Sequence, residues 1–206
     1  MKFKILEKKD DKIKFTISEI TDAMAGELRR IMISEVPTMS IETVSFNKND
    51  SALWDEIVAH RLGLIPLTFD PSFFNRKETC KHCKGKGCAH CQVSLVLKEK
   101  GPKVVHSGDL KSTDKKVKPV FEKIPVTELN EDQEIELEAI AQIGTGREHA
   151  KWQAAVVGYK TDDKKKEFTF TVESVCGLDA EQVVMQALDV LDNKLKYFEE
   201  GVSKLK

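Results

Sequence analysis

Residues 22–36 read DAMAGELRRIMISEV, and this stretch decides how the N-terminal half of the chain folds. Its apolar side chains recur at the 3.6-residue spacing of an α-helix, at Met24, Leu28, Ile31 and Met32. Thr21 or Asp22 supplies an N-cap, and Pro37 ends the helix because the residue before a proline avoids the α region. Ile33 and Val36 widen the apolar stripe beyond half the circumference. The pattern fits either a buried core helix or a helix shared with a partner subunit.

Two more helices are predicted from the same periodicity. The first covers Ala52–Leu62 and ends at Gly63, with four inward side chains, Leu53, Trp54, Ile57 and Val58. The second runs from Asp179 to Gly201. Its apolar stripe comprises Val184, Ala187, Leu188, Leu191, Leu195 and Phe198.

Strands are predicted where apolar and polar residues alternate or β-branched residues cluster. The predicted strands are 12–17, 39–46, 93–97, 135–143, 155–159 and 168–172, with an edge strand at 64–69 and a charged turn at 161–166. Helices and strands are segregated along the chain rather than alternating, which indicates the α+β class. We expect 1–69 and 155–206 to form one discontinuous subdomain, and 70–154 to form a mostly-β inserted subdomain.

Composition narrows the range of functions. The chain has 206 residues, 40% of them hydrophobic, and its 33 basic and 34 acidic side chains give a formal net charge of -1. This balance gives no electrostatic case for nonspecific nucleic-acid binding. No apolar run reaches the ~18 residues of a membrane span, and the first residues show no signal-peptide pattern. We therefore expect a soluble, cytoplasmic protein without membrane contact.

Four cysteines are crowded into residues 80–91, CKHCKGKGCAHC. Cys80, Cys83, Cys88 and Cys91 have the spacing C-x2-C-x4-C-x2-C, in which two hooks of paired thiolates close a tetrahedral site for zinc. An iron–sulfur cluster is the alternative ligand, and four reduced thiols without metal are a third possibility. His82 and His90 are not needed as ligands, because four thiolates fill the site.

Motifs of catalysis are missing from the sequence, which has no P-loop, G-x-S-x-G or H-E-x-x-H. Glu148 and His149 are adjacent, so on a regular element their side chains point apart, which is poor geometry for a base and its orienting group. The sequence therefore favours a binding or assembly role over an enzyme activity of its own.

Three segments together resemble the family of D subunits of archaeal RNA polymerase. They are LRRIMISEVPTMSIE (28–42), AHRLGLIPL (59–67) and GTGREHAKWQAA (144–155). The family is the counterpart of the bacterial α-subunit N-terminal domain and of the third-largest subunit of eukaryotic polymerase II. The resemblance implies an α-subunit-like dimerisation subdomain with helices on an antiparallel sheet, and a noncatalytic scaffold within the nucleotidyltransferase complex.

The resemblance also implies partners. The helices at 22–36 and 180–200 would pack on a small α-like subunit (L), and the small subunits N and P and then the two largest subunits would join this heterodimer, without direct DNA contact by this chain. Arg29 and Arg30 would face the large subunits, and the segment Arg147–Trp152 would dock on the second-largest. The implied interface residues are Met24, Leu28, Arg29, Arg30, Ile31, Met32, Arg147, Glu148, His149, Trp152, Val184, Leu188, Leu191 and Leu195. For Trp152, core packing is the alternative.

The cysteine segment resembles the zinc loop of the eukaryotic relatives, although the spacing between cysteines differs. Residues 98–130 are too short, and contain no cysteine, for the ferredoxin-like insertion that many archaeal relatives carry. Two other classes of protein remain as alternatives, an iron–sulfur or redox-responsive protein that uses Cys80–Cys91 and a small zinc module that binds nucleic acid.

Overall fold

The computed structural model describes residues 1–162 and 167–205 and divides into two compact units. Unit 1 comprises Met1–Pro37 and Thr145–Lys206, and unit 2 comprises Thr38–Gly144. The sequence placed these boundaries at 69/70 and 154/155 instead. They fall at 37/38 and 144/145 because strand β3 (Thr38–Asn49) pairs along its length with strand β8 (Glu134–Gly144).

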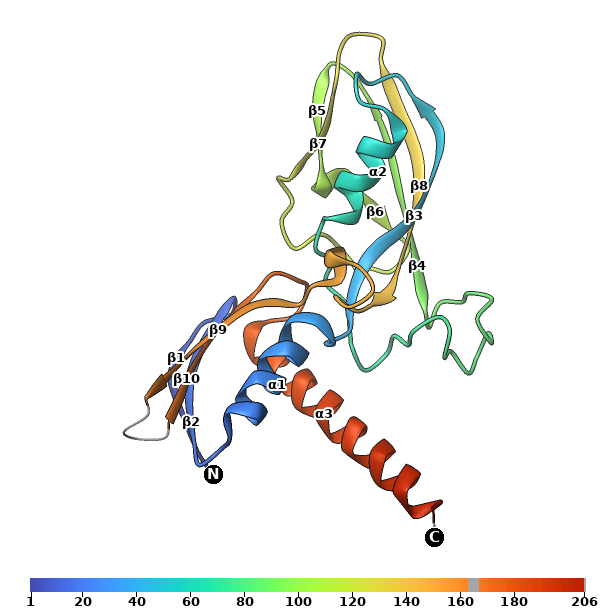
Figure 1. Ribbon diagram of the computed structural model, residues 1–206. Coiled ribbons are helices and arrows are strands. Elements are labelled where there is room, and N and C mark those ends of the chain that lie inside the picture. The colour runs from blue at the N-terminus through green and yellow to red at the C-terminus, as the bar shows by residue number, and fades with distance from the viewer. Residues whose placement is uncertain (163–166, 206) are drawn as a thin grey trace. The chain divides into compact units, whose positions relative to one another are not determined.

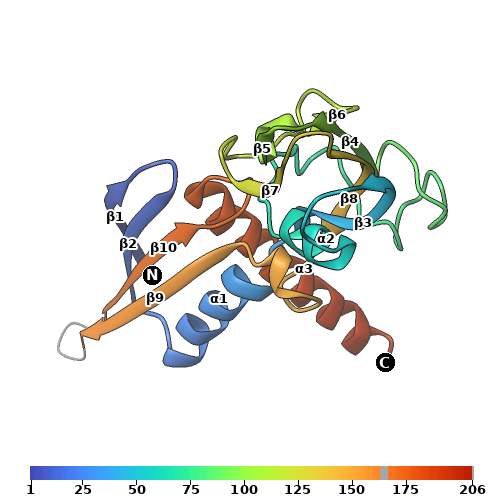
Figure 2. The same cartoon turned by 90° about the horizontal axis from the view of Figure 1, so that it is seen from above.

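Unit 1 is built on an antiparallel four-stranded sheet in the order β1-β2-β10-β9. Its strands are β1 (Lys2–Lys8), β2 (Lys12–Ser18), β9 (Ala155–Asp162) and β10 (Glu167–Ser174). Figure 1 shows helices α1 (Asp22–Ser34) and α3 (Ala180–Ser203) on the same face of this sheet, and Figure 2 shows α1 beside strand β9. Alternation in β2 and β10 directs Phe15 and Phe170 into the core, where the rings stack with centroids 5.3 Å apart.

Helix α1 begins as predicted, because the Thr21 hydroxyl accepts a hydrogen bond from the Met24 N–H at 3.2 Å. It ends at Ser34, two residues before the predicted end at Val36. Its buried side chains lie on the predicted apolar stripe, except that Ala25 takes the place expected for Met24. They are Ala25, Leu28, Ile31 and Met32.

Helix α3 changes character along its length. Asp179 and Gln182 form a reciprocal capping box at its start. Its first half buries Ala180, Val183 and Ala187. From Asp192 to Leu205 every residue is exposed. Figure 1 shows this second half extending beyond the sheet of its own unit.

Unit 2 contains a second antiparallel sheet in the order β3-β8-β4-β6, a two-stranded β5-β7 pair and helix α2. Its remaining elements are β4 (Gln92–Lys100), β5 (Lys103–His106), β6 (Lys111–Ser112), β7 (Pro125–Leu129) and α2 (Asp55–Gly63). Central strand β8 confirms the predicted alternation at 135–143. It buries Ile135, Leu137, Ala139, Ala141 and Ile143.

Helix α2 departs from the prediction. It starts at Asp55 rather than Ala52, and Trp54 is its N-cap. Placing Trp54 and Ile57 inward was wrong, because they are 74% and 45% exposed. A helix of nine residues presents only about two positions per face, and Val58 and Leu62 occupy the inner face.

The α+β class with antiparallel sheets is therefore confirmed. The charged turn predicted at 161–166 lies largely outside the described residues. Among those described, no helix is long and apolar enough to span a membrane.

Candidate metal centre and helix interface

The cysteine segment folds as two tight turns that bring the thiols together ahead of strand β4. Hydrogen bonds from the Lys84 N–H to the Cys80 carbonyl (2.9 Å) and from the Cys91 N–H to the Cys88 carbonyl (2.9 Å) close these turns. Gly85 and Gly87 have φ of 84° and 97°. These positive values favour glycine, so the two glycines allow the chain to reverse between the cysteine pairs.

The four sulfur atoms fit a metal ion. All four lie within 4.8 Å of one another, with Cys80–Cys88, Cys83–Cys91 and Cys88–Cys91 separated by 3.8, 3.6 and 3.9 Å. A tetrahedral zinc ion with sulfur ligands requires about 3.8 Å between sulfurs. The predicted grouping of Cys80, Cys83, Cys88 and Cys91 is thus confirmed.

Backbone dipoles also prepare this site for thiolates. The Gly87 N–H and the Cys88 N–H donate to the Cys83 and Cys91 sulfurs, each at 3.2 Å. Burial opposes ionisation of Cys83, but the Gly87 N–H and the neighbouring thiols lower its pKa to about 7. Burial dominates at Cys91 and raises its pKa to about 12. Metal binding must therefore displace a proton from Cys91.

An aromatic stack lies beside the cysteines. His82 and His90 stack with ring centroids 4.2 Å apart, and Phe73 packs on His90 at 4.8 Å. The two histidines are thus engaged with each other and with Phe73. Sequence reasoning had given Phe73 no role, because a single phenylalanine in a loop carries no periodic signal.

The predicted interface residues of α1 and α3 divide into two groups. Leu28, Ile31 and Met32 are buried in the core of this chain. Val184 and Leu191 are half-buried and Met24 is 36% exposed, while Leu188 and Leu195 are 42% and 61% exposed. The structure therefore leaves the α3 residues accessible and most of the α1 stripe covered by its own sheet.

Ionic contacts join α1 to α3. Lys194 of α3 pairs with Glu27 and Glu35 of the α1 region at 3.1 and 2.7 Å, and Glu27 also pairs with Arg30 at 2.6 Å. No pattern in the sequence indicates these pairs, because the partners lie about 160 positions apart in the chain.

The two arginines of α1 are both engaged within unit 1. Arg29 donates from Nε to the Val157 carbonyl of β9 at 2.9 Å, and Arg30 donates to Glu27. Both side chains nevertheless stay largely exposed. An arginine that satisfies a carbonyl on an edge strand also protects that edge from pairing with another strand.

The segment Arg147–Trp152 is a turn that leads into a short 3-10 helix, Ala150–Trp152. The Glu148 carboxylate accepts from the Thr145 N–H at 2.8 Å, and the His149 Nδ1 accepts from the Lys151 N–H at 3.1 Å. Arg147, Glu148 and His149 are exposed. Trp152 is only 8% exposed, with the Lys151 ammonium 4.4 Å from its ring centroid.

Comparison with known proteins agrees with this architecture. Residues 39–177 match the family described as the RNA polymerase Rpb3/RpoA insert domain. The DNA-directed RNA polymerase subunit Rpo3 of Methanosarcina acetivorans is 40% identical over 207 residues, covering 99% of this chain and 76% of the relative. The Rpo3 proteins of Methanosphaera stadtmanae and Thermococcus kodakarensis are 46% and 45% identical over 78% of this chain.

The alignments cover 61% and 59% of the Methanosphaera and Thermococcus relatives, so the chain spans about three fifths of their length there. The family match extends over more than half of this chain, and the Methanosarcina relative aligns over almost all of it. The chain therefore belongs to the Rpo3 family, the D subunits among the α-like subunits of RNA polymerase.

Proposed function

We propose that this chain is a noncatalytic assembly subunit of DNA-dependent RNA polymerase that first forms a heterodimer with a small α-like subunit (L). The observation that carries the proposal is an apolar row along α3 whose side chains pass from half-buried to exposed toward the end of the helix. We call this row the α3 seam, and it comprises Val184, Leu188, Leu191, Leu195, Phe198 and Val202.

The α3 seam has the geometry that a second helix requires. Its residues are spaced alternately four and three positions apart, which is the a/d pattern of a helix that packs along another helix by knobs into holes. Phe198 is 71% exposed and Val202 44% exposed. An exposed apolar row of this length is a liability unless a partner covers it.

A second exposed surface, at residues 147–149, supports a second step of assembly. Arg147, Glu148 and His149 form a polar, exposed segment whose backbone is fixed by the Arg147 N–H bond to the Ser34 carbonyl at 2.8 Å. A rigid exposed arginine is suited to an interface hot spot. In this proposal the small subunits N and P bind the heterodimer, and the second-largest subunit then docks on Arg147–His149, with Arg29 and Arg30 facing the large subunits.

The cysteine site would hold a structural zinc ion. Four cysteine ligands close the coordination sphere, so a metal there would have no open position for a substrate. The zinc would fix residues 80–91 and the start of strand β4, which pairs with the central strand β8. We therefore assign the site to stability of unit 2 rather than to redox chemistry.

The first test is to recover the tagged full-length chain from its native cells at moderate salt and to identify the bound proteins by mass spectrometry. The proposal expects the two largest polymerase subunits and a small α-like subunit in stoichiometric amounts. Recovery of the chain alone, or together with redox proteins, would contradict it.

A further inference from the structure

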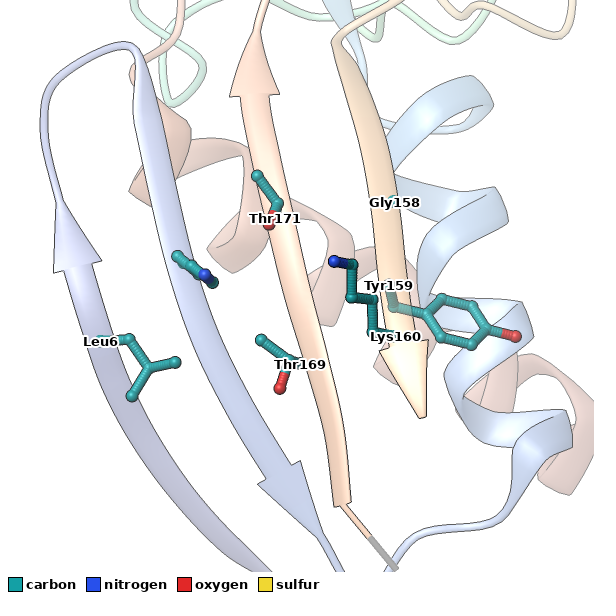
Figure 3. A pocket seen from close by; sticks show the side chains of 7 residues that line it. Leu6, Gly158, Tyr159, Lys160, Thr169 and Thr171 are labelled. Carbon is teal, nitrogen blue, oxygen red and sulfur yellow. The ribbon is translucent and has the colours of Figure 1, made fainter. Parts of the chain in front are cut away.

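The sheet of unit 1 carries a groove on the face opposite its helices. The groove has a volume of about 510 Å³ and is lined by residues of all four strands, Leu6, Lys14, Gly158, Tyr159, Lys160, Thr169 and Thr171. Figure 3 shows Thr169, Thr171 and Lys160 on the open face. Tyr159 contributes little to that face, because its ring packs on the core rings of Phe168 and Phe170.

Gly158 leaves one position in the floor of this groove without a side chain. It lies inside strand β9 opposite Thr171, and a Cβ atom built on it would meet nothing within 4 Å. The backbone conformation there does not require glycine, because its φ lies outside the left-handed region. A glycine weakens a strand interior, and it often marks a place where another backbone approaches closely.

The charged side chains that line the groove, Lys14 and Lys160, are both basic. Lys14 lies opposite Thr171 on the side away from Gly158, and Lys160 lies opposite Thr169. No acidic side chain lines the groove. Glu7 lies opposite Lys14 in strand β1, but its carboxylate pairs with Lys9 at 3.0 Å. Lys12, one position along the same face, is by contrast neutralised by Glu173 at 2.7 Å.

We propose that this groove receives an extended acidic segment of another polymerase subunit, whose backbone passes over Gly158. Carboxylates of the segment would bind Lys14 and Lys160, and the Thr169 and Thr171 hydroxyls and the Leu6 side chain would complete the contact. The segment lies across the sheet rather than along its edge, because Arg29 already occupies the Val157 carbonyl of edge strand β9. This inference rests on the proposed function as a polymerase subunit.

Two lysines on a sheet form a footprint suited to a short peptide. Nucleic acid that binds through its phosphates needs a longer basic track, and the formal net charge of this chain is -1. The groove therefore fits an acidic peptide better than a phosphate backbone, and the experiment below separates the two.

The test places a photo-crosslinking amino acid, p-benzoylphenylalanine, at position 158 of the full chain assembled into polymerase in native cells. Position 115 of unit 2 is the control, because it is exposed and lies neither in the groove nor on α3. We expect position 158, but not position 115, to yield a covalent product with a polymerase peptide that has a net negative charge.

Charge variants make the test specific. Lys14→Glu with Lys160→Glu should reduce the yield of that product at least tenfold, and Lys14→Gln with Lys160→Gln should reduce it less. Lys115→Glu with Lys123→Glu changes the net charge by the same amount away from the groove and should leave the yield unchanged. Raising the salt concentration should lower the yield with the wild-type lysines.

Three results would overturn the inference while leaving the proposed function intact: polymerase that co-purifies without a product from position 158, a product with a neutral or basic peptide, or a product with nucleic acid. If the large subunits do not co-purify with the unsubstituted chain, the proposed function fails and this inference fails with it. The melting temperature of each variant, measured alongside, separates loss of contact from loss of fold.

Discussion

The ammonium group of Lys194 on α3 lies 2.7 Å from the carboxylate of Glu35, the residue that caps the C-terminus of α1. The hydrogen bond to Glu35 is the main cause of the raised pKa of Lys194. The contact sits where α3 leaves the core of its unit, since every residue from Asp192 to Leu205 is exposed. It therefore ties the start of the exposed half of α3 to the end of α1.

Replacing Lys194 with Met should weaken binding of the small α-like subunit severalfold with little change in melting temperature. Methionine keeps the apolar stem but removes the charge that holds α3 to Glu27 and Glu35. Titration calorimetry with the partner subunit would measure the affinity. Lys196→Met is the control, because the ion pair of Lys196 among the described residues, with Asp192, lies within α3. Equal effects of the two substitutions would remove Lys194 from this role.

Leu188→Asp or Leu195→Asp should abolish the heterodimer while the isolated chain keeps its fold. Both side chains are accessible in this chain, so the cost arises only when a partner helix buries the new charge. Size-exclusion chromatography of the co-expressed pair would report assembly. Asn193→Asp introduces the same charge on an exposed position of α3 outside the seam and should leave assembly unchanged. If all three variants assemble normally, the α3 seam is not the interface.

Leu28→Asp should act through folding instead. Leu28 is 6% exposed within its own chain, so the aspartate would be buried without a partner and should cost several kcal/mol, on the order of the whole stability of a domain. Circular dichroism of the isolated chain would detect the loss of structure before any partner is added. A variant that melts like the wild type but fails to assemble would show that Leu28 belongs to the interface after all.

Trp152→Ala and Arg147→Ala should have different effects, because Trp152 belongs to the core and Arg147 to the proposed interface. Trp152 is 8% exposed, and truncating a buried tryptophan costs about 3–5 kcal/mol, so this variant should melt early. Arg147 is exposed, so its truncation should leave the melting temperature and the small heterodimer intact but reduce recovery of the second-largest subunit. Quantitative mass spectrometry of purified complexes would measure that recovery. Full recovery with Arg147→Ala would exclude Arg147 as an anchor.

The purified chain should carry about one equivalent of zinc, measured by inductively coupled plasma mass spectrometry. Cys83→Ser should lose the metal and lower the melting temperature, whereas Cys176→Ser should retain it, because Cys176 lies outside the cluster. Metal should be released as the pH falls from about 8 to about 5, since protons compete for the thiolates. Absorbance near about 400 nm would point instead to an iron–sulfur cluster.

The sequence predicted well what depends on neighbours along the chain. The start of α1, with Thr21 or Asp22 as its N-cap, the alternation in β8 and the grouping of the four cysteines all follow from side-chain type and spacing over a few residues. The sequence predicted poorly which side chains of a helix or strand are buried, because burial depends on the elements that pack against it. Trp54 and Ile57 matched a helical stripe, yet the helix begins after Trp54 and turns both side chains outward.

By itself, the sequence determined the α+β class, the three helices, the grouping of the four cysteines and the family, because periodicity and motif spacing are local properties that survive without coordinates. Only the tertiary structure decided that strand β3 belongs to unit 2, that Leu28 is core while Leu195 is exposed, and that Lys194 meets Glu35. The physical reason is that an apolar stripe indicates that a helix face is buried, but not whether its own chain or a partner subunit buries it. Pairings between residues more than a hundred positions apart are fixed only when strands and helices pack.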